Sequence, residues 1–255
     1  GIELSLNADA IRTKDFDWNI SLNLAHNENE VTRLSNDVFT MDKILLGDVF
    51  IRGGSSSGTH VLEEGRPIGQ FYGLVCNGID ENGRYIMVDK DGDGEISDPA
   101  DYDYIGSAQP KLTYGITNTF RYKNFDLSFF LRGTIGNDIL NATRMAYAQS
   151  GFLPGTNALD DPLTYTLSET PRFSNYYLEK GSFMRLDNLT LGYKIKALNG
   201  IRVYFTAQNL FVITKYKGLD PEVPMDSGDG LTPGVEPREF YPKARTFSVG
   251  LNLNF

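Results

Sequence analysis

The residues whose types and spacing best suit chemistry lie in one acidic stretch, between positions 89 and 101. Asp stands at its first, third and fifth places and Gly94 at its sixth, which is the first half of an EF-hand calcium loop. Calcium prefers about six to eight oxygen ligands, and alternate carboxylates on a tight turn converge on one point. We therefore expect a structural Ca²⁺ site whose ligands are Asp89, Asp91, Asp93, Glu95 through its carbonyl, Ser97 and Asp101.

The end of this stretch departs from the EF-hand pattern. Ala100 occupies the twelfth place, where the pattern has a glutamate. Asp101 stands one residue later and Asp98 two residues earlier, and either carboxylate can close the site. The other interpretation is a solvated acidic turn that holds no ion. A bound ion would stiffen the loop and would take no part in catalysis.

The rest of the sequence offers no catalytic constellation. It contains no Gly-x-Ser-x-Gly elbow, no HExxH and no Walker-type glycine loop. His26 and His60 have no ordered nucleophile as a partner in the pattern, and we expect both to be solvated loop residues. The single cysteine, Cys76, excludes a disulfide framework. We therefore expect a protein that is not an enzyme.

Length, charge and composition narrow the class of protein further. The chain has 255 residues and a formal net charge of -9, which argues against nucleic-acid binding because that needs a basic surface. Its unbroken apolar runs are only a few residues long, whereas a transmembrane helix needs about 20 apolar residues. Aromatic residues make up 12% of the chain, a composition that favours β structure.

Alternation of apolar and polar residues predicts seven strands, each with one apolar face. The expected strands are 2–10, 16–24, 112–122, 125–135, 189–195, 201–213 and 247–255. The alternation changes phase near Asp187 and Asn188, which predicts a β-bulge. Strands of soluble proteins have about 5–6 residues and tilted membrane-spanning strands about 9–11. Because most of the predicted strands reach the longer range, we expect an all-β, antiparallel transmembrane β-barrel.

The connections between these strands alternate between short and long. The short ones are 12–15, 123–124 and 197–200, the last of which ends in the hairpin signal Asn199-Gly200. The long ones are 27–111, 136–182 and 214–242. Outer-membrane barrels have short periplasmic turns and long extracellular loops. Tyr122, Phe125 and Tyr193 lie near the short turns, as expected of an aromatic girdle at the membrane interface.

Seven strands do not make a self-contained barrel. Bacterial single-chain barrels have an even number of strands, and an open sheet leaves two unpaired edges in lipid. We therefore expect residues 1–255 to be the C-terminal part of one larger barrel domain, which another polypeptide segment completes. The open alternative is a soluble β domain, namely a calcium-stiffened cell-surface adhesin or a carbohydrate-binding domain, because sandwich strands also alternate.

A series of short motifs resembles the SusC/RagA-type TonB-dependent outer-membrane transporters. The motifs are 1–6 (GIELSL), 13–18 (TKDFDW), 65–73 (GRPIGQFYG), 89–94, 104–111 (YIGSAQPK), 136–139 (GNDI), 177–193, 208–211 (QNLF), 216–222 (YKGLDPE) and 241–255. Each is weak alone, but their order and spacing span almost the whole chain. The terminal Phe255 also fits an outer-membrane assembly signal.

The resemblance implies a barrel of about 22 strands with a plugged lumen. It implies active import of oligosaccharides or peptides across the outer membrane of a Gram-negative, Bacteroidetes-like cell. The plug and the segment that contacts TonB would lie in an N-terminal part that is absent from this chain. The implied partners are that remaining barrel and plug part, a SusD-like surface lipoprotein that caps the barrel, TonB, the cargo and the lipid bilayer.

Overall fold

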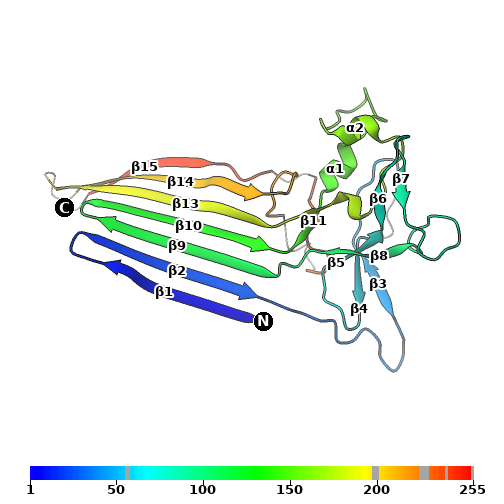
Figure 1. The fold of residues 1–255 in the computed structure, drawn as a ribbon, viewed down its shortest axis with the longest axis horizontal. Helices are drawn as coiled ribbons and strands as arrows, with labels where there is room; N and C mark the ends of the chain where they lie inside the picture. The colour runs from blue at the N-terminus through cyan, green and yellow to red at the C-terminus, as the bar shows by residue number, and fades with distance from the viewer. Residues whose placement is uncertain (55–57, 197–200, 224–229, 239–240, 254–255) are drawn as a thin grey trace.

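A computed structural model describes residues 1–54, 58–196, 201–223, 230–238 and 241–253. In this part the chain is all-β, with antiparallel sheets and three short helical segments. One long sheet lies on one side of the molecule, and a compact body formed by the long connections lies at one end of its strands (Figure 1). None of the described helices is long and apolar enough to cross a membrane.

The long sheet contains the predicted strands. Its seven members, in spatial order, are β1 (Ile2–Arg12), β2 (Phe16–His26), β9 (Leu112–Tyr122), β10 (Phe125–Ile135), β13 (Phe183–Ile195), β14 (Ile201–Thr214) and β15 (Thr246–Asn252). Every neighbouring pair is antiparallel. β13 begins six residues earlier than expected, at Phe183 rather than at position 189. β15 ends at Asn252, whereas the alternation predicted a strand to position 255, and residues 254–255 lie outside the described part. The other strands begin and end within two residues of the predicted bounds, and their order along the chain is as predicted.

The predicted β-bulge is confirmed at Asp187. The register between β10 and β13 shifts between Phe130 and Leu131, and that between β13 and β14 shifts between Leu186 and Asn188. Because strand side chains alternate between the two faces of a sheet, the extra residue moves the side chains before it to the opposite face. Arg185 on one side of the bulge therefore pairs with Arg132 on the polar face.

The two faces of the long sheet differ in chemistry across its whole width. On one face, apolar residues pair across strands: Leu4 with Leu24, Trp18 with Phe120, Leu127 with Leu191 and Phe205 with Val249. On the other face, hydroxyls and amides pair: Ser5 with Asn23, Ser21 with Thr117, Thr190 with Thr206 and Thr206 with Ser248. The apolar face is largely uncovered within the chain, since Leu4 is 53% exposed and Val249 76% exposed.

Two of the three short turns lie in the described part, at the end of the sheet opposite the compact body (Figure 1). Three exposed aromatic side chains, Tyr122, Phe125 and Tyr193, stand at this end, and the rings of Phe125 and Tyr193 are 4.6 Å apart. This clustering is the arrangement expected of an interfacial aromatic girdle. The third turn, 197–200 with Asn199-Gly200, lies outside the described residues, and so does Phe255.

The connection 27–111 is more ordered than the sequence suggested. It contains a four-stranded sheet in the order β3 (Lys43–Leu46), β4 (His60–Glu63), β5 (Gln70–Leu74) and β8 (Tyr102–Ser107), and a hairpin of β6 (Cys76–Ile79) and β7 (Tyr85–Met87). These strands have three to six residues, too short for alternation to reveal them.

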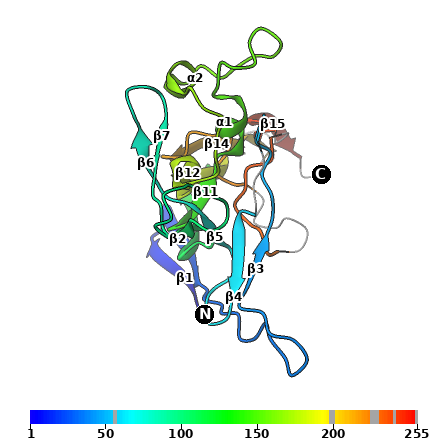
Figure 2. The ribbon, with the colours of Figure 1, turned by 90° about the vertical axis from the view of Figure 1, so that its right-hand side faces the viewer.

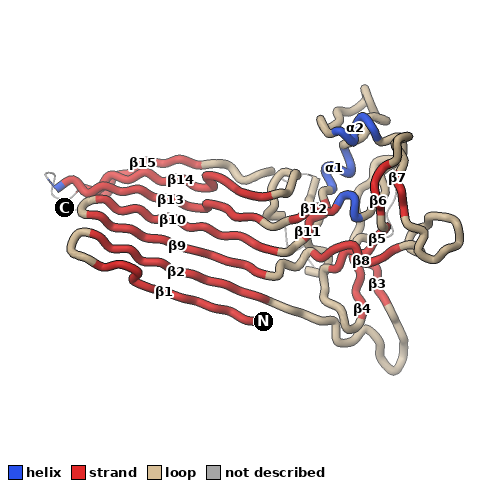
Figure 3. The backbone as a smooth tube through the Cα atoms, in the orientation of Figure 1, coloured by secondary structure: helices blue, strands red, loops and turns tan. Residues whose placement is uncertain are grey.

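The connection 136–182 completes the compact body. It contains β11 (Asp138–Leu140), β12 (Leu178–Lys180), α1 (Ala142–Tyr147), α2 (Pro162–Thr166) and a 3₁₀ helix, η1 (Asn175–Tyr177). The helices lie on one side of the body, and β3 and β4 lie on the other (Figures 2 and 3). The main hydrophobic core is here, built around Phe71, Leu140, Met145, Phe173 and Tyr177, so the long connections fold as a unit.

The expectation that His60 is a solvated loop residue is wrong. Its side chain is fully buried, and its ring packs against Phe71 with 4.5 Å between centroids. Nε2 lies 2.9 Å from the Pro233 carbonyl oxygen, which can only accept, so Nε2 donates. Nδ1 then accepts from the Thr59 hydroxyl at 2.9 Å. The pairing with position 233 joins segments far apart in sequence, which no local pattern reveals.

Candidate functional site

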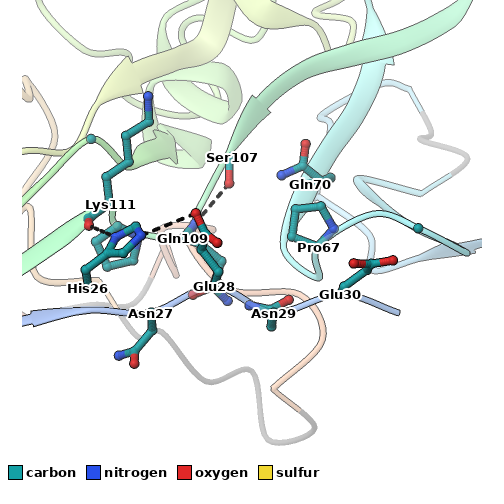
Figure 4. A pocket seen from close by; sticks show the side chains of 13 residues that line it. His26, Asn27, Glu28, Asn29, Glu30, Pro67, Gln70, Ser107, Gln109 and Lys111 are labelled. Carbon is teal, nitrogen blue, oxygen red and sulfur yellow. Dashed lines mark hydrogen bonds and ion pairs between the residues drawn. The ribbon is translucent and has the colours of Figure 1, made fainter. Parts of the chain in front are cut away.

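A wide cleft lies where the long sheet meets the compact body. It has a volume of about 780 Å³ and is lined by the segment 26–30 after β2, the turn between β4 and β5, the segment between β8 and β9, and Gly136 after β10 (Figure 4). These segments all leave the long sheet, or approach it, at the end away from the short turns. The cleft therefore opens at the mouth of the strands.

Hydrogen bonds hold the walls of the cleft in place. The Val31 amide donates to the Arg66 carbonyl and the Gly65 amide to the Val31 carbonyl, both at 2.9 Å. The Ile68 amide donates to Asn29 Oδ1 at 2.8 Å. These bonds fix the segment after β2 to the turn that precedes β5.

His26 lies at the edge of the cleft, where its side chain binds the backbone of Lys111. Its Nδ1 lies 2.6 Å from the Lys111 carbonyl oxygen and donates to it, because a carbonyl oxygen has no proton to give. Nε2 lies 3.3 Å from Oε1 of Glu28, in the direction of the cleft (Figure 4). A hydrogen bond forms there only when the imidazole is protonated. As expected from the sequence, this histidine is partly solvated.

Several polar groups of the cleft are free to bind a ligand. Within the part of the chain that the structure describes, the side-chain amides of Gln70 and Gln109 and the carboxylate of Glu30 make no hydrogen bond or ion pair. The Ser107 hydroxyl accepts from the backbone N–H of Gln109 at 3.3 Å. The arrangement suits binding by hydrogen bonds.

Apart from His26, the sequence patterns did not single out the cleft residues. The motifs that carried the family resemblance were the available signal, because 65–73, 104–111 and 136–139 all contribute to the lining.

The acidic stretch lies at a different place, in the connection between β7 and β8. Carboxylate oxygens of Asp89, Asp91 and Asp101 all lie within 4.8 Å of one another. Asp89 accepts from the amides of Gly92 at 2.6 Å and Gly94 at 2.9 Å, which bends the chain into a tight turn. Three of the six predicted ligands therefore converge.

Asp101 ties the end of the acidic loop to its start. Asp101 is buried and accepts from the amides of Lys90 at 2.6 Å and Ser97 at 2.7 Å. Asp98 instead forms an ion pair with Arg172 at 2.7 Å. Asp93 accepts from the Glu95 amide at 2.8 Å, and its carboxylate is not part of the converging group.

The electrostatics of the acidic loop fit a cation. Amide hydrogen bonds from Ser97 and Lys90 lower the pKa of Asp101 and keep it charged. The Asp93 amide favours the charged form of Asp91, but burial and the charges of Asp93, Asp101 and Asp89 together raise its pKa. Hard carboxylate oxygens that repel one another are the donor set that Ca²⁺ prefers.

A third feature, an ion network on the polar face, was not foreseen. Its members are Arg132, Arg185, Asp187, Asp220, Glu222 and Lys243. Arg132 binds both oxygens of Glu222, at 2.7 and 3.0 Å, and Arg185 binds Asp220 at 2.5 Å. The bulge at Asp187 makes this possible, because it turns Arg185 to the polar face beside Arg132. The network fixes the segment after β14 to the sheet.

Comparison with known proteins identifies the family. The TonB-dependent receptor SusC of Bacteroides thetaiotaomicron is 36% identical over 274 residues, an alignment that covers 100% of this chain and 26% of SusC. The TonB-dependent receptor P3 of Formosa agariphila is 32% identical over 301 residues, covering 100% of this chain and 28% of that receptor. The chain belongs to the SusC/RagA-type TonB-dependent receptors. The resemblance inferred from the motifs is confirmed.

Solved structures agree with this assignment. The structure of the RagAB peptide transporter matches 98% of this SusC/RagA-type chain with a TM-score of 0.75 and 26% identity. The RagAB peptide importer in its "closed-closed" state matches the same share with a TM-score of 0.74. The chain covers 28% of each of those chains and between 26% and 30% of the curated relatives. No family model matches the chain.

Proposed function

We propose that this SusC/RagA-type chain forms part of the wall and the mouth of an outer-membrane transporter that imports nutrients in a TonB-dependent manner. The observation that carries the proposal is the long sheet with one continuous apolar face and one continuous polar face. An uncovered apolar face of this width suits lipid, and the opposite face of hydroxyls and amides suits a water-filled or plugged lumen.

The edges of the sheet support a larger barrel. β1 and β15 each pair on one side only, and unpaired edges are costly in lipid. Strands from the remainder of the same receptor close the barrel, with a total of about 22 strands around a plug. Residues 1–255 contribute the C-terminal part of one barrel domain, and the plug belongs to another part of the receptor.

The partners follow from the family and from the place of the compact body. The body lies at the extracellular end of the strands, where a SusD-like surface lipoprotein caps the mouth. The cargo is an oligosaccharide or a peptide, and the energy comes through TonB from the inner membrane. The receptor works in the outer membrane of a Gram-negative, Bacteroidetes-like cell, and no step of this import needs an enzyme. The soluble adhesin alternative is disfavoured because a soluble domain would leave the apolar face of the sheet exposed to water.

The acidic loop serves this function as a structural element. Ca²⁺ held by Asp89, Asp91 and Asp101 stiffens the connection between β7 and β8 within the mouth. The convergence of these carboxylates and the raised pKa of Asp91 support the assignment. The ion contributes no chemistry to transport.

The test is uptake by cells that express the full-length receptor with its lipoprotein. Accumulation of labelled oligosaccharides and peptides is measured with and without tonB, and the receptor is located by membrane fractionation. The proposal predicts a receptor in the outer-membrane fraction and uptake that stops without tonB. A receptor that stays soluble without detergent, or uptake that is indifferent to tonB, would overturn it.

A further inference from the structure

We propose that the end of the long sheet that carries the short turns binds the phosphate headgroups of anionic phospholipids. The inference rests on the proposed place of the sheet in the outer membrane, and it names the lipid class that this end prefers. Three exposed lysines lie here: Lys14 in the turn between β1 and β2, Lys123 in the turn between β9 and β10, and Lys196 directly after β13. Clustered lysines at the boundary of a membrane attract anionic lipids.

Backbone hydrogen bonds join these turn ends into one rim. The Lys123 amide donates to the Asp15 carbonyl at 2.9 Å, so the first two turns lie side by side. The Lys194 amide donates to the Asn124 carbonyl, also at 2.9 Å, which ties the second turn to the end of β13. Figure 1 shows all three ends on the side away from the compact body. The lysines therefore share one edge of the sheet, which a plane of headgroups can meet as a whole.

The strand aspartates near the rim are paired with arginines, whereas the lysines have no such partner. The pairs are Asp9 with Arg12 at 3.8 Å, Asp17 with Arg121 at 3.7 Å and Asp126 with Arg202 at 2.5 Å. Within the part of the chain that the structure describes, Lys14, Lys123 and Lys196 form no ion pair, and Asp15 is the one acid in the two turns. The rim is therefore positive, although the formal net charge of the chain is -9.

Exposed aromatic rings place the rim at the depth of the headgroups. Tyr122 and Phe125 flank Lys123, and each is 51% exposed. Nζ of Lys123 lies 5.3 Å from the centre of the Tyr122 ring, a distance typical of a cation–π contact. Tyr193 packs against Phe125 near the end of β13. Tyrosine rings favour the boundary between acyl chains and headgroups, so the ammonium group beside Tyr122 stands at the level of the phosphates.

Lysine suits a ligand that has no fixed position. Its ammonium group is a compact charge on a flexible stem, and it binds a phosphate without the fixed orientation that a guanidinium fork requires. The arginines near the rim already use their forks on aspartates. Headgroups in a fluid bilayer exchange continually, so the lysines should enrich anionic lipid at the rim rather than hold one molecule tightly.

The enrichment is measured with a single fluorescent label in the full-length receptor. Leu191→Cys places the label on the apolar face near the rim, because Leu191 pairs with Leu127 and is 46% exposed. The receptor is reconstituted in phosphatidylcholine bilayers that contain a rising share of phosphatidylglycerol, or of phosphatidylcholine, with nitroxide quenchers on the tails. The receptor without the substitution is the control for labelling at Cys76, which is buried.

Three further variants carry the same label. Lys14→Gln/Lys123→Gln/Lys196→Gln removes the positive charges of the rim. Lys14→Arg/Lys123→Arg/Lys196→Arg keeps them. Lys215→Gln/Lys217→Gln removes two exposed lysines that follow β14, at the opposite end of the sheet. Heat-modifiable migration confirms that each variant has assembled a barrel.

Phosphatidylglycerol should quench the label at a share about fivefold or more below that of phosphatidylcholine, since one lysine near a headgroup is worth about fivefold. The preference should disappear in the glutamine variant of the rim and persist in the arginine variant and in Lys215→Gln/Lys217→Gln. Excess inorganic phosphate at constant ionic strength should leave it intact.

Equal quenching by the two lipids, or a preference that survives in the glutamine variant, overturns the headgroup site. Loss of the preference in inorganic phosphate also overturns it, because the rim would then bind free phosphate as well as lipid. In each of these cases strong quenching by both lipids leaves the membrane-spanning sheet standing. Quenching by neither lipid overturns the proposed function itself, so the two failures are distinguishable.

Discussion

Removal of Asp220 should release the segment after β14 from the wall of the sheet. Arg185 and Asp220 are 1% and 5% exposed, and the Arg185 guanidinium binds Asp220 at 2.5 Å. In Asp220→Ala the buried guanidinium of Arg185 still has two partners. It keeps its hydrogen bond to Asn209 and its 3.5 Å ion pair with Glu222. Breaking a buried pair by removing one partner costs about 3–5 kcal/mol. Since these partners remain, we expect the lower value, about 3 kcal/mol.

Hydrogen exchange of the full-length receptor measures this loss locally. The Leu219 amide is the best reporter, because its acceptor is Glu236 and the substitution leaves that residue unchanged. A loss of about 3 kcal/mol in the free energy of opening corresponds to exchange about a hundredfold faster. Asp37→Ala is the control, since its ion pair with Arg33 is exposed and worth about 0–1 kcal/mol. Leu219 exchange within a factor of about three of the wild type would refute the role given to the buried pair.

Three other features can be tested in the same receptor. Terbium luminescence and Ca²⁺ titration should show one site in the acidic loop, which is lost in Asp89→Asn/Asp101→Asn and retained in Glu81→Gln. Without Ca²⁺, the raised pKa of Asp91 should make the amides of this loop less protected against hydrogen exchange as the pH rises through that pKa. Bound Ca²⁺ should remove this pH dependence. Deletion of Asp187 should turn Arg185 away from its partners and prevent assembly of a heat-modifiable barrel, whereas Asp187→Asn should assemble. His60→Ala should cost about 2–4 kcal/mol of stability in chemical unfolding because it leaves a cavity and an unpaired Pro233 carbonyl, and His26→Ala less than about 1 kcal/mol.

The long strands could be predicted from sequence because their signal is local and repeated. Residues such as Leu4, Leu6 and Ala8 recur on one face at every second position, because strand side chains alternate with a period of two. The bulge at Asp187 was visible for the same reason, as a break in phase. The acidic loop could be recognised because all of its predicted ligands lie within 13 consecutive residues.

The compact body and the cleft could not be predicted in this way. Their contacts join distant positions, such as His60 with Pro233 and Asn29 with Ile68. The short strands of the body are selected by packing around Phe71 and Tyr177 rather than by a period in the sequence. The cleft exists only after four separate segments have been brought together at the end of the long sheet.

The lipid-facing wall is tested most directly by placing single fluorescent labels on the two faces of β15. Val249→Cys and Ser248→Cys are neighbours in sequence and point to opposite faces, with Val249 on the apolar one. Each is labelled in the full-length receptor in bilayers whose lipid tails carry nitroxide quenchers, with the unmodified receptor as the control for buried Cys76. The label at position 249 should be strongly quenched and that at 248 should not. Equal quenching, or the reverse order, would contradict the membrane-spanning sheet.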